Sequence, residues 1–354
     1  MTVAGTADGV DGTGVIYLVP NALHPLEPAA WSGPIRRLGL AIEGTELASV
    51  LAEFECELDR VGIMQVRPRY YLSTEWGVPV DSTAIAIPFY LARPDLTALQ
   101  RERHGYVEGV GRYDILRYLR HEMGHVVNYA WRLYDHPEWV EHFGSITQPY
   151  EDEYRPEPFS PRYVLHLPGW YAQKHPDEDW SETFAVWMTP GRDWRSEYAS
   201  WPVALAKLEY CDCVMRQLRN VPPLVTSTHL DEDVGEIEFT VQEWFADAGG
   251  QFEPMPPGLD GALRTIFGEF EPSPQALAAA DLLAQLQPLL LENVYRWTGH
   301  FPEHTRELLQ FLRRRAAELR LCYPRGREDA LAVAVTTLVT ALAMNHVHRG
   351  SYLP

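Results

Sequence analysis

The sequence predicts an α+β N-terminal domain with a small mixed sheet, followed by an all-helical C-terminal domain. Short alternating apolar segments are mixed with helical periodicity over the first 220 residues, whereas only long Leu- and Ala-rich periodic segments follow residue 237. The 354 residues amount to about two domains at ~150 residues per domain. The expected units are a flexible tail at 1–14, a first domain at 15–220, a linker at 221–236 and a helical domain at 237–354.

Three segments of the first domain are strand candidates. Residues 15–19, 65–72 and 83–91 are short apolar or alternating runs of the kind that forms half-buried strands. Pro88 lies in the last of them and cannot donate to a ladder, so this strand is expected at an edge of the sheet. An extended peptide could add to such an edge as a further strand.

Helical periodicity covers much of the remaining first domain. Apolar residues at spacings of three and four predict a helix at 45–60 and a longer, very regular one at 113–134. The segment 136–175 is rich in proline and aromatic residues, has little periodicity, and is expected to be a long ordered connection. Two further helices are predicted at 176–189 and 201–218, the first of them bounded by prolines.

The C-terminal third has a different character. A Pro pair, Ser and Thr residues and an acidic cluster predict that 221–236 links two domains, and periodic segments then predict helices at 275–295, 304–321 and 328–346. The most apolar stretch, 330–344, is shorter than the ~20 residues of a membrane span, so a buried helix is expected there. Binding of a protein partner is the role that we consider for this domain.

Charge and cysteine content narrow the functional classes. The chain carries 30 Lys and Arg against 49 Asp and Glu, a formal net charge of −19. Such an acidic chain repels phosphate backbones and anionic lipid, so neither nucleic acid nor membrane is expected as a partner. Four scattered cysteines do not form a disulfide framework, and the first residues lack the pattern of a signal peptide. These features predict a cytoplasmic protein.

The segment 121–125 reads His-Glu-Met-Gly-His and lies within the most regular predicted helix. At positions i and i+4, His121 and His125 project from one face of a helix, so both imidazoles can reach one Zn²⁺ ion. Glu122 is then beside the open coordination position, where it can act as a general base. The pattern predicts two of the three protein ligands of a zinc site.

The third ligand is expected at the start of the helix predicted from residue 176. Glu178 and Glu182 are four residues apart and share one face, so one can bind the metal while the other accepts a hydrogen bond from a ligand histidine. Glu178 is favoured as the ligand and Glu182 as its supporting partner, with Glu182 or an aspartate as alternative ligands. Asp177 and Asp179 can be explained by capping of the helix N-terminus.

These motifs resemble gluzincin metallopeptidases. The run Glu-Asp-Trp-Ser-Glu-Thr-Phe at 178–184 is similar to the version in the anthrax lethal factor-like clan, in which a tyrosine precedes the ligand glutamate by seven residues. By this resemblance Tyr171 would hydrogen-bond the oxyanion of the reaction. The match is closer to a bacterial family of uncharacterised zinc-binding metallopeptidases and covers about residues 15–220. Its landmarks are segments 84–91, 117–125, 148–150, 162–166, 169–173 and 179–190.

The resemblance implies a zincin-like first domain and zinc-dependent cleavage of peptide bonds in a peptide or protein substrate. Glu122 would take the proton from a zinc-activated water, with His121, His125 and Glu178 as the metal ligands. His166 is expected to support this site because it is near Tyr171 in the sequence. Two alternatives stay open: an inactive zincin-fold binding module with structural zinc, and a zinc amidohydrolase that acts on a non-peptide amide.

Overall fold

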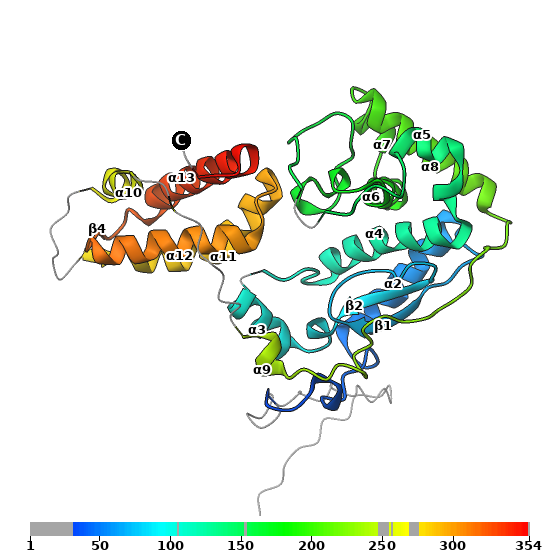
Figure 1. The fold of residues 1–354 in the computed structure, drawn as a ribbon, viewed down its shortest axis with the longest axis horizontal. Coiled ribbons are helices and arrows are strands. Elements are labelled where there is room, and N and C mark those ends of the chain that lie inside the picture. The colour runs from blue at the N-terminus through cyan, green and yellow to red at the C-terminus, as the bar shows by residue number, and fades with distance from the viewer. Residues whose placement is uncertain are drawn as a thin grey trace, which may run out of the picture.

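The computed structural model describes residues 31–104, 106–151, 154–246, 255, 258–268 and 276–352. The tail expected at 1–14 and the strand candidate at 15–19 lie outside the described residues. The described chain is mostly helical, with 59% helix and a small sheet, which agrees with the α+β class. The helices form two groups, one coloured from blue to green and one from yellow to red (Figure 1).

The N-terminal unit contains a two-stranded parallel sheet. β1 (Arg69–Ser73) pairs with β2 (Ala84–Pro88), and Tyr71 is opposite Ala86. β1 begins four residues later than the predicted strand, because Pro68 has no backbone N–H to donate to a ladder. A further segment joins the sheet through one antiparallel bridge between Gly77 and Ala86.

The strand expected at 83–91 lies at an edge as predicted, since β2 is one of the two strands of this sheet in the described chain, but this edge is covered. All five residues of β2 are buried, and the backbone N–H of Ala86 donates to the Gly77 carbonyl at 2.8 Å. The N–H of Thr83 donates to the Ser227 carbonyl at 2.8 Å, so neighbouring segments of the chain cover this strand. After Pro88 the chain turns into the short helix η2 (Phe89–Ala92). The structure therefore offers no support for strand addition of a substrate at β2.

The two helices predicted in the first half of the chain are confirmed. α2 (Glu46–Val61) buries its apolar face against the sheet, and α4 (Arg112–Trp131) lies between the sheet and the helices that follow it (Figure 1). The packed side of α2 consists of Leu47, Val50, Leu51, Phe54 and Leu58. The remaining elements of this half are η1 (Ile35–Arg37), α3 (Pro94–His104) and η3 (Leu133–Asp135).

The described residues of the segment 136–175, which exclude 152 and 153, include helices that the sequence did not predict. These helices are α5 (Pro137–Phe143) and the 3₁₀ segment η4 (Pro168–Gln173). α5 buries Trp139 and Phe143, which are one turn apart and too few to give a clear periodic pattern. The following helices are α6 (Pro176–Met188), α7 (Trp194–Glu197) and α8 (Pro202–Leu218), and the first and last of these agree with the predicted ranges.

A close crossing of α4 and α6 fixes the relative position of the motifs. A Cβ atom on Gly124 would lie 2.6 Å from the Cα of Ser181, so only glycine allows this approach. The indole N–H of Trp180 donates to the Gly124 carbonyl at 2.8 Å across the same contact. The acidic first turns of α6 are thereby held against the His121–His125 face of α4.

The segment 221–236, expected to be a linker, packs along the first unit. The N–H of Leu224 donates to the Ala130 carbonyl at 2.7 Å, and the N–H of Val234 donates to the Leu72 carbonyl at 2.8 Å. The next helix, α9 (Val241–Trp244), buries Val241 in the same core. The first unit therefore continues beyond residue 236, where the helical domain was expected to begin, because this stretch carries apolar side chains for the first core.

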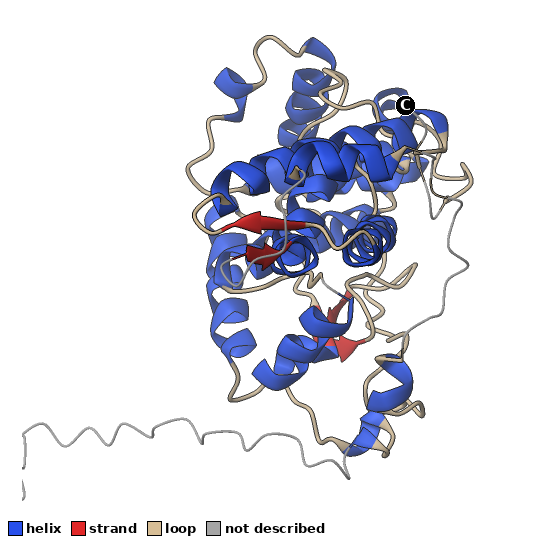
Figure 2. Ribbon diagram, turned by 90° about the vertical axis from the view of Figure 1, so that its left-hand side faces the viewer, coloured by secondary structure: helices blue, strands red, loops and turns tan. Residues whose placement is uncertain are grey.

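The C-terminal unit has its own hydrophobic core. Its helices are α10 (Leu259–Phe267), α11 (Ala279–Thr298), α12 (Pro302–Glu318) and α13 (Glu328–Arg349). The expectation that this domain is all-helical is wrong in one detail, because β3 (Ala276–Ala278) pairs antiparallel with β4 (Cys322–Pro324). Figure 2 shows this strand pair apart from the first sheet. The predicted start at residue 275 lies outside the described residues.

α13 is the one helix of the described chain with the length and apolar composition of a membrane span. It packs in the C-terminal core through Val335, Val339 and Ala343, each of which is buried. Of its most apolar window, 33% is buried. Core helices of soluble proteins have the same composition, so this is weak evidence for a membrane segment.

The two units meet beside η4. The Tyr154 hydroxyl donates to the Gly169 carbonyl at 2.7 Å, and Tyr295 of α11 lies against Gly169 so closely that a Cβ there would be 2.4 Å from its ring. Gly169 has a positive φ of 81° and Trp170, which follows it, one of 63°. This turn directs the next residue, Tyr171, toward the middle of α4, with its ring centre 5.5 Å from that of His121.

Candidate metal centre

Three buried side chains converge between α4 and α6. The Nε2 atoms of His121 and His125 are 3.2 Å apart, and they lie 3.0 and 3.3 Å from Oε2 of Glu178. All three residues are less than a tenth exposed. Three donor atoms about 3 Å apart surround a position of the size that a transition-metal ion takes with bonds of ~2.0–2.2 Å. The structure therefore contains a buried group that could hold a metal ion.

The state of Glu178 supports a cation at this position. Its Oε2 is buried and has no hydrogen-bond partner within the described residues, although two imidazoles are close to it. Burial opposes the ionisation of this carboxyl, but His125 and His121 hold its pKa well below the usual range. A buried carboxylate oxygen without a donor is costly unless a cation binds it. The donor set of two imidazoles and one carboxylate fits zinc.

The structure places Glu182 behind His121. One carboxylate oxygen of Glu182 is 2.9 Å from Nδ1 of His121, and the other accepts the backbone N–H of Leu167 at 2.8 Å. Burial lowers the pKa of His121, but its carboxylate neighbours Glu178 and Glu182 raise it to about 9 in the metal-free protein. Glu182 thus orients the imidazole so that Nε2 points to the other donors.

Asp177 has the corresponding position behind His125. Its Oδ2 lies 3.0 Å from Nδ1 of His125 and accepts a hydrogen bond from the Tyr129 hydroxyl at 2.6 Å, whereas its Oδ1 accepts one from the Asn128 amide at 2.6 Å. Sequence reasoning assigned Asp177 to helix capping and missed this role. The side chain of His175 caps α6 instead, by accepting the N–H of Asp177 at 3.2 Å. The only sign of this contact in the sequence was the run of adjacent acidic residues at the start of the helix.

The remaining aspartate, Asp179, pairs with a lysine away from the three donors. Oδ2 of Asp179 accepts a hydrogen bond from Nζ of Lys207 at 2.5 Å, on the side of α6 that faces α8. Burial raises the pKa of Asp179 to about 7, although Lys207 opposes this shift. The geometry thus favours Glu178 over Glu182 and over either aspartate as the third ligand.

Two tyrosines stand on the other side of Glu178. The Tyr150 hydroxyl donates to Oε1 of Glu178 at 2.6 Å and lies 3.4 Å from the Tyr171 hydroxyl. Burial and the Glu178 charge raise the pKa of Tyr171 well above its usual value, so its hydroxyl keeps its proton and can donate. Tyr150 appeared in the sequence only as part of a family landmark, and its contact with Glu178 was not foreseen.

His166 has a different role from the one expected. Its Nε2 lies 3.0 Å from the carbonyl oxygen of Arg117, one turn before His121. This hydrogen bond fixes the backbone of α4 rather than a metal-binding side chain. Burial, with a smaller contribution from His121, lowers the pKa of His166 well below its usual value, so the imidazole is neutral.

A cavity of about 370 Å³ reaches one of the three donors, His121. Glu122 and Tyr171 line it, together with residues from both units of the chain. Burial raises the pKa of Glu122 to about 7, and the charges of His121 and His125 oppose this shift. A carboxyl group with a pKa close to neutrality can both accept and return a proton.

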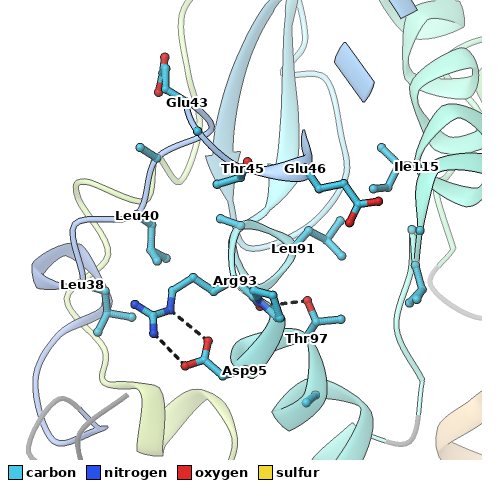
Figure 3. Close-up of a pocket in the computed structure, with 18 of the residues that line it drawn as sticks. Leu38, Leu40, Glu43, Thr45, Glu46, Leu91, Arg93, Asp95, Thr97 and Ile115 are labelled. Atoms are coloured by element: carbon cyan, nitrogen blue, oxygen red, sulfur yellow. Dashed lines mark hydrogen bonds and ion pairs between the residues drawn. The ribbon is translucent and has the colours of Figure 1, made fainter. Parts of the chain in front are cut away.

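A larger cavity of about 910 Å³ lies elsewhere, between the loop before α2 and the start of α3. Figure 3 shows Leu38 and Leu40 on one side and Leu91 on the other, with the ion pair of Arg93 and Asp95 at its lower edge. None of the candidate catalytic residues lines it. Size alone therefore does not identify the chemical site of this chain.

Comparisons with known proteins find no relative of this chain. No protein-family model, curated protein or solved structure is detectably similar to the chain. The resemblance to zinc metallopeptidases rests on the motif residues alone, and the zincin fold and the activity that it implies stay predictions.

Proposed function

We propose that this chain is a zinc-dependent metallopeptidase whose ion is held by His121, His125 and Glu178. One observation carries the proposal: His121, one of the three converging buried donors, lines a cavity that Glu122 and Tyr171 also line. A structural zinc site closes its coordination with protein atoms, whereas a catalytic site keeps one position open. Three protein donors, one of which lines an accessible cavity, support the catalytic type.

Each side chain around the cavity has a defined task in this proposal. Bound zinc supplies Lewis acidity toward water and the scissile carbonyl group. The carboxylate of Glu122 takes a proton from the attacking water and later passes it to the leaving amide nitrogen. The hydroxyl of Tyr171, which stays protonated, donates a hydrogen bond to the carbonyl oxygen as negative charge develops on it. Tyr150 keeps Glu178 in place through its hydrogen bond to Oε1.

The charge of the cavity favours a basic substrate. Besides Glu122, the carboxyl groups of Glu75, Glu108 and Glu303 line the cavity, and Lys174 is the one lysine or arginine in its described lining. Opposite charge in a partly enclosed cleft attracts a substrate and orients it. We therefore expect cleavage next to lysine or arginine side chains.

The C-terminal unit contributes directly to this cavity. Tyr295 at the end of α11, Phe301 before α12 and Glu303 in the first turn of α12 all line it. The helical unit thus forms part of the substrate cleft, in addition to any protein partner that it binds.

The first experiment measures metal content by mass spectrometry of wild type, His125→Ala and Glu178→Ala. About one zinc per chain is expected at this site in wild type, with loss in both variants. A zinc content in Glu178→Ala equal to that of wild type would move the third ligand to another carboxylate. Wild-type protein without zinc after reconstitution would refute the proposed centre.

The second experiment compares wild type with Glu122→Gln on a peptide library that contains basic residues. We expect Glu122→Gln to keep its zinc and lose cleavage by at least about 10²-fold, because the proton acceptor is removed. Glu157→Gln, which changes a carboxylate outside the cavity lining, should leave cleavage unchanged. Zinc binding without cleavage of any peptide would instead favour the binding module or an amidohydrolase of non-peptide amides.

A further inference from the structure

Three histidines of the C-terminal unit form a second cluster. His300 precedes α12, His304 lies in its first turn, and His346 lies near the end of α13. Each contributes a ring nitrogen to a group in which all ligand atoms are within 4.8 Å of one another. No sequence motif joins them, because His346 is distant in sequence from the other two.

The spacing of the rings matches that of the proposed zinc pair. Ring centres are 5.0 Å apart for His300 and His346, 5.2 Å for His304 and His346, and 5.8 Å for His300 and His304. The corresponding distance between His121 and His125 is 5.0 Å. Imidazoles that share an ion at ~2.0–2.1 Å from each nitrogen necessarily have ring centres about 5 Å apart.

The hydrogen bonds of His300 define which of its nitrogens faces the cluster. The Thr305 hydroxyl donates to the Phe301 carbonyl at 3.2 Å, so its oxygen accepts the N–H of Nδ1 of His300 at 2.7 Å. Nε2 of His300 then carries a lone pair, which faces the Tyr352 hydroxyl at 3.1 Å. That hydroxyl can donate instead to the His304 carbonyl at 3.3 Å, so Nε2 can bind a cation without leaving Tyr352 unpaired.

The surroundings select the chemistry of the ligand. His300 is buried, and because the Thr305 hydroxyl accepts the N–H of its Nδ1, its Nε2 keeps the lone pair that metal binding requires. The cluster borders a cavity of about 380 Å³, whose described lining includes Arg155 and no carboxylate. Calcium and magnesium require oxygen ligands, whereas three imidazoles suit Zn²⁺, Co²⁺, Ni²⁺ or Cu²⁺.

We propose that His300, His304 and His346 form a second transition-metal site, separate from the one between α4 and α6. An ion there ties the connection between α11 and α12 to the end of α13. Phe301 and Glu303, which lie between two of these ligands in the sequence, line the substrate cavity. The second ion therefore stabilises the part of the C-terminal unit that forms one wall of the cleft.

The test measures the metal stoichiometry of the full-length chain. Metal-free protein is titrated with Co²⁺, and bound metal is determined from visible absorption and, after gel filtration, by mass spectrometry. Wild type should bind about two ions per chain, and His346→Ala and His125→Ala about one each. The double variant His125→Ala/His346→Ala should bind none. His348→Ala is the matched control, because it removes an exposed histidine two residues further along α13.

Thermal stability gives an independent measurement in His125→Ala, which lacks the first site. Saturating Zn²⁺ should raise its melting temperature, and the rise should disappear in His125→Ala/His346→Asn, whose folding is checked by circular dichroism. Metal binding by His346→Ala equal to that of wild type, or loss of all metal in His125→Ala, overturns the proposal. Neither outcome depends on peptidase activity. Failure of the second metal site can therefore be distinguished from failure of the proposed catalytic function.

Discussion

Asp177 and Glu182 each approach the outer nitrogen of one proposed ligand imidazole, at 3.0 and 2.9 Å. Such carboxylates fix the tautomer and orientation of a ligand histidine. We expect Asp177→Asn and Glu182→Gln to weaken zinc affinity by about 10- to 100-fold, with zinc still bound at saturation. Competition with a chromophoric chelator measures this. Glu209→Gln on the exposed side of α8 is the control, and unchanged affinity in both variants would exclude the orienting role.

Glu303 tests the charge of the cavity from the C-terminal side. Its carboxylate is exposed and lines the cavity, so Glu303→Gln removes a negative charge without opening the core. At a surface cleft one charge contributes about 1 kcal/mol, so we expect kcat/KM to fall about 5-fold for peptides with lysine or arginine. Neutral peptides should be cleaved at the wild-type rate. An equal decrease for both peptide classes, or a decrease in Glu307→Gln, would contradict electrostatic selection.

Glu108 gives the metal-free protein a defined dependence of stability on pH. Burial, followed by the charges of Glu122, Glu75 and Glu303, raises its pKa from 4.5 to about 7. Because the folded state binds the proton more tightly, its free energy of unfolding falls as pH rises from 4.5 to 7. Glu108→Gln should therefore stabilise the fold by about 1–2 kcal/mol at pH 8 and not at pH 4. Denaturant titrations at both values measure this, with the exposed Glu102→Gln as control.

At the scale of elements, the contact of α4 with α6 depends on Gly124. Alanine favours a helix over glycine by about 1 kcal/mol, but its Cβ would lie 2.6 Å from Ser181 of α6. We expect Gly124→Ala to cost about 1–3 kcal/mol and to reduce zinc content, since α6 carries Glu178. Gly261→Ala in α10 is the matched control, because nothing lies within 4 Å of its Cβ. Stability and zinc content at wild-type levels in Gly124→Ala would show that α6 can move without consequence.

The sequence predicted those elements whose own residues carry the pattern. α2, α4, α6 and α8 follow from apolar spacing and prolines, but α3 buries only Leu96 and Leu99 and was missed. His121, His125 and Glu178 follow from helical spacing in two segments. The contacts of Asp177 with His125 and of Tyr150 with Glu178 require the crossing of α4 with α6 and the path of the long connection. Spacing within one segment cannot supply such contacts between segments.

At the scale of the whole molecule, the two units meet at the proposed catalytic cavity. Tyr295 lies against Gly169 and lines the cavity, and its ring is 6.0 Å from that of Phe301 and 5.9 Å from that of Tyr106. The Gly169 turn also places Tyr171 close to His121. The C-terminal unit should therefore influence both substrate binding and the position of the proposed oxyanion donor.

Tyr295→Ala tests this coupling. It removes an aromatic contact between the units, so we expect a loss of about 2–4 kcal/mol in stability and increased hydrogen exchange in η4. Zinc content should not change, whereas KM for basic peptides should rise and kcat should fall as Tyr171 becomes less well placed. Trp297→Ala, which truncates a 54% exposed ring two residues further along α11, is the control. If Tyr295→Ala and Trp297→Ala showed the same hydrogen exchange in η4 and the same peptide cleavage, the C-terminal unit would lie next to the cleft without forming part of it.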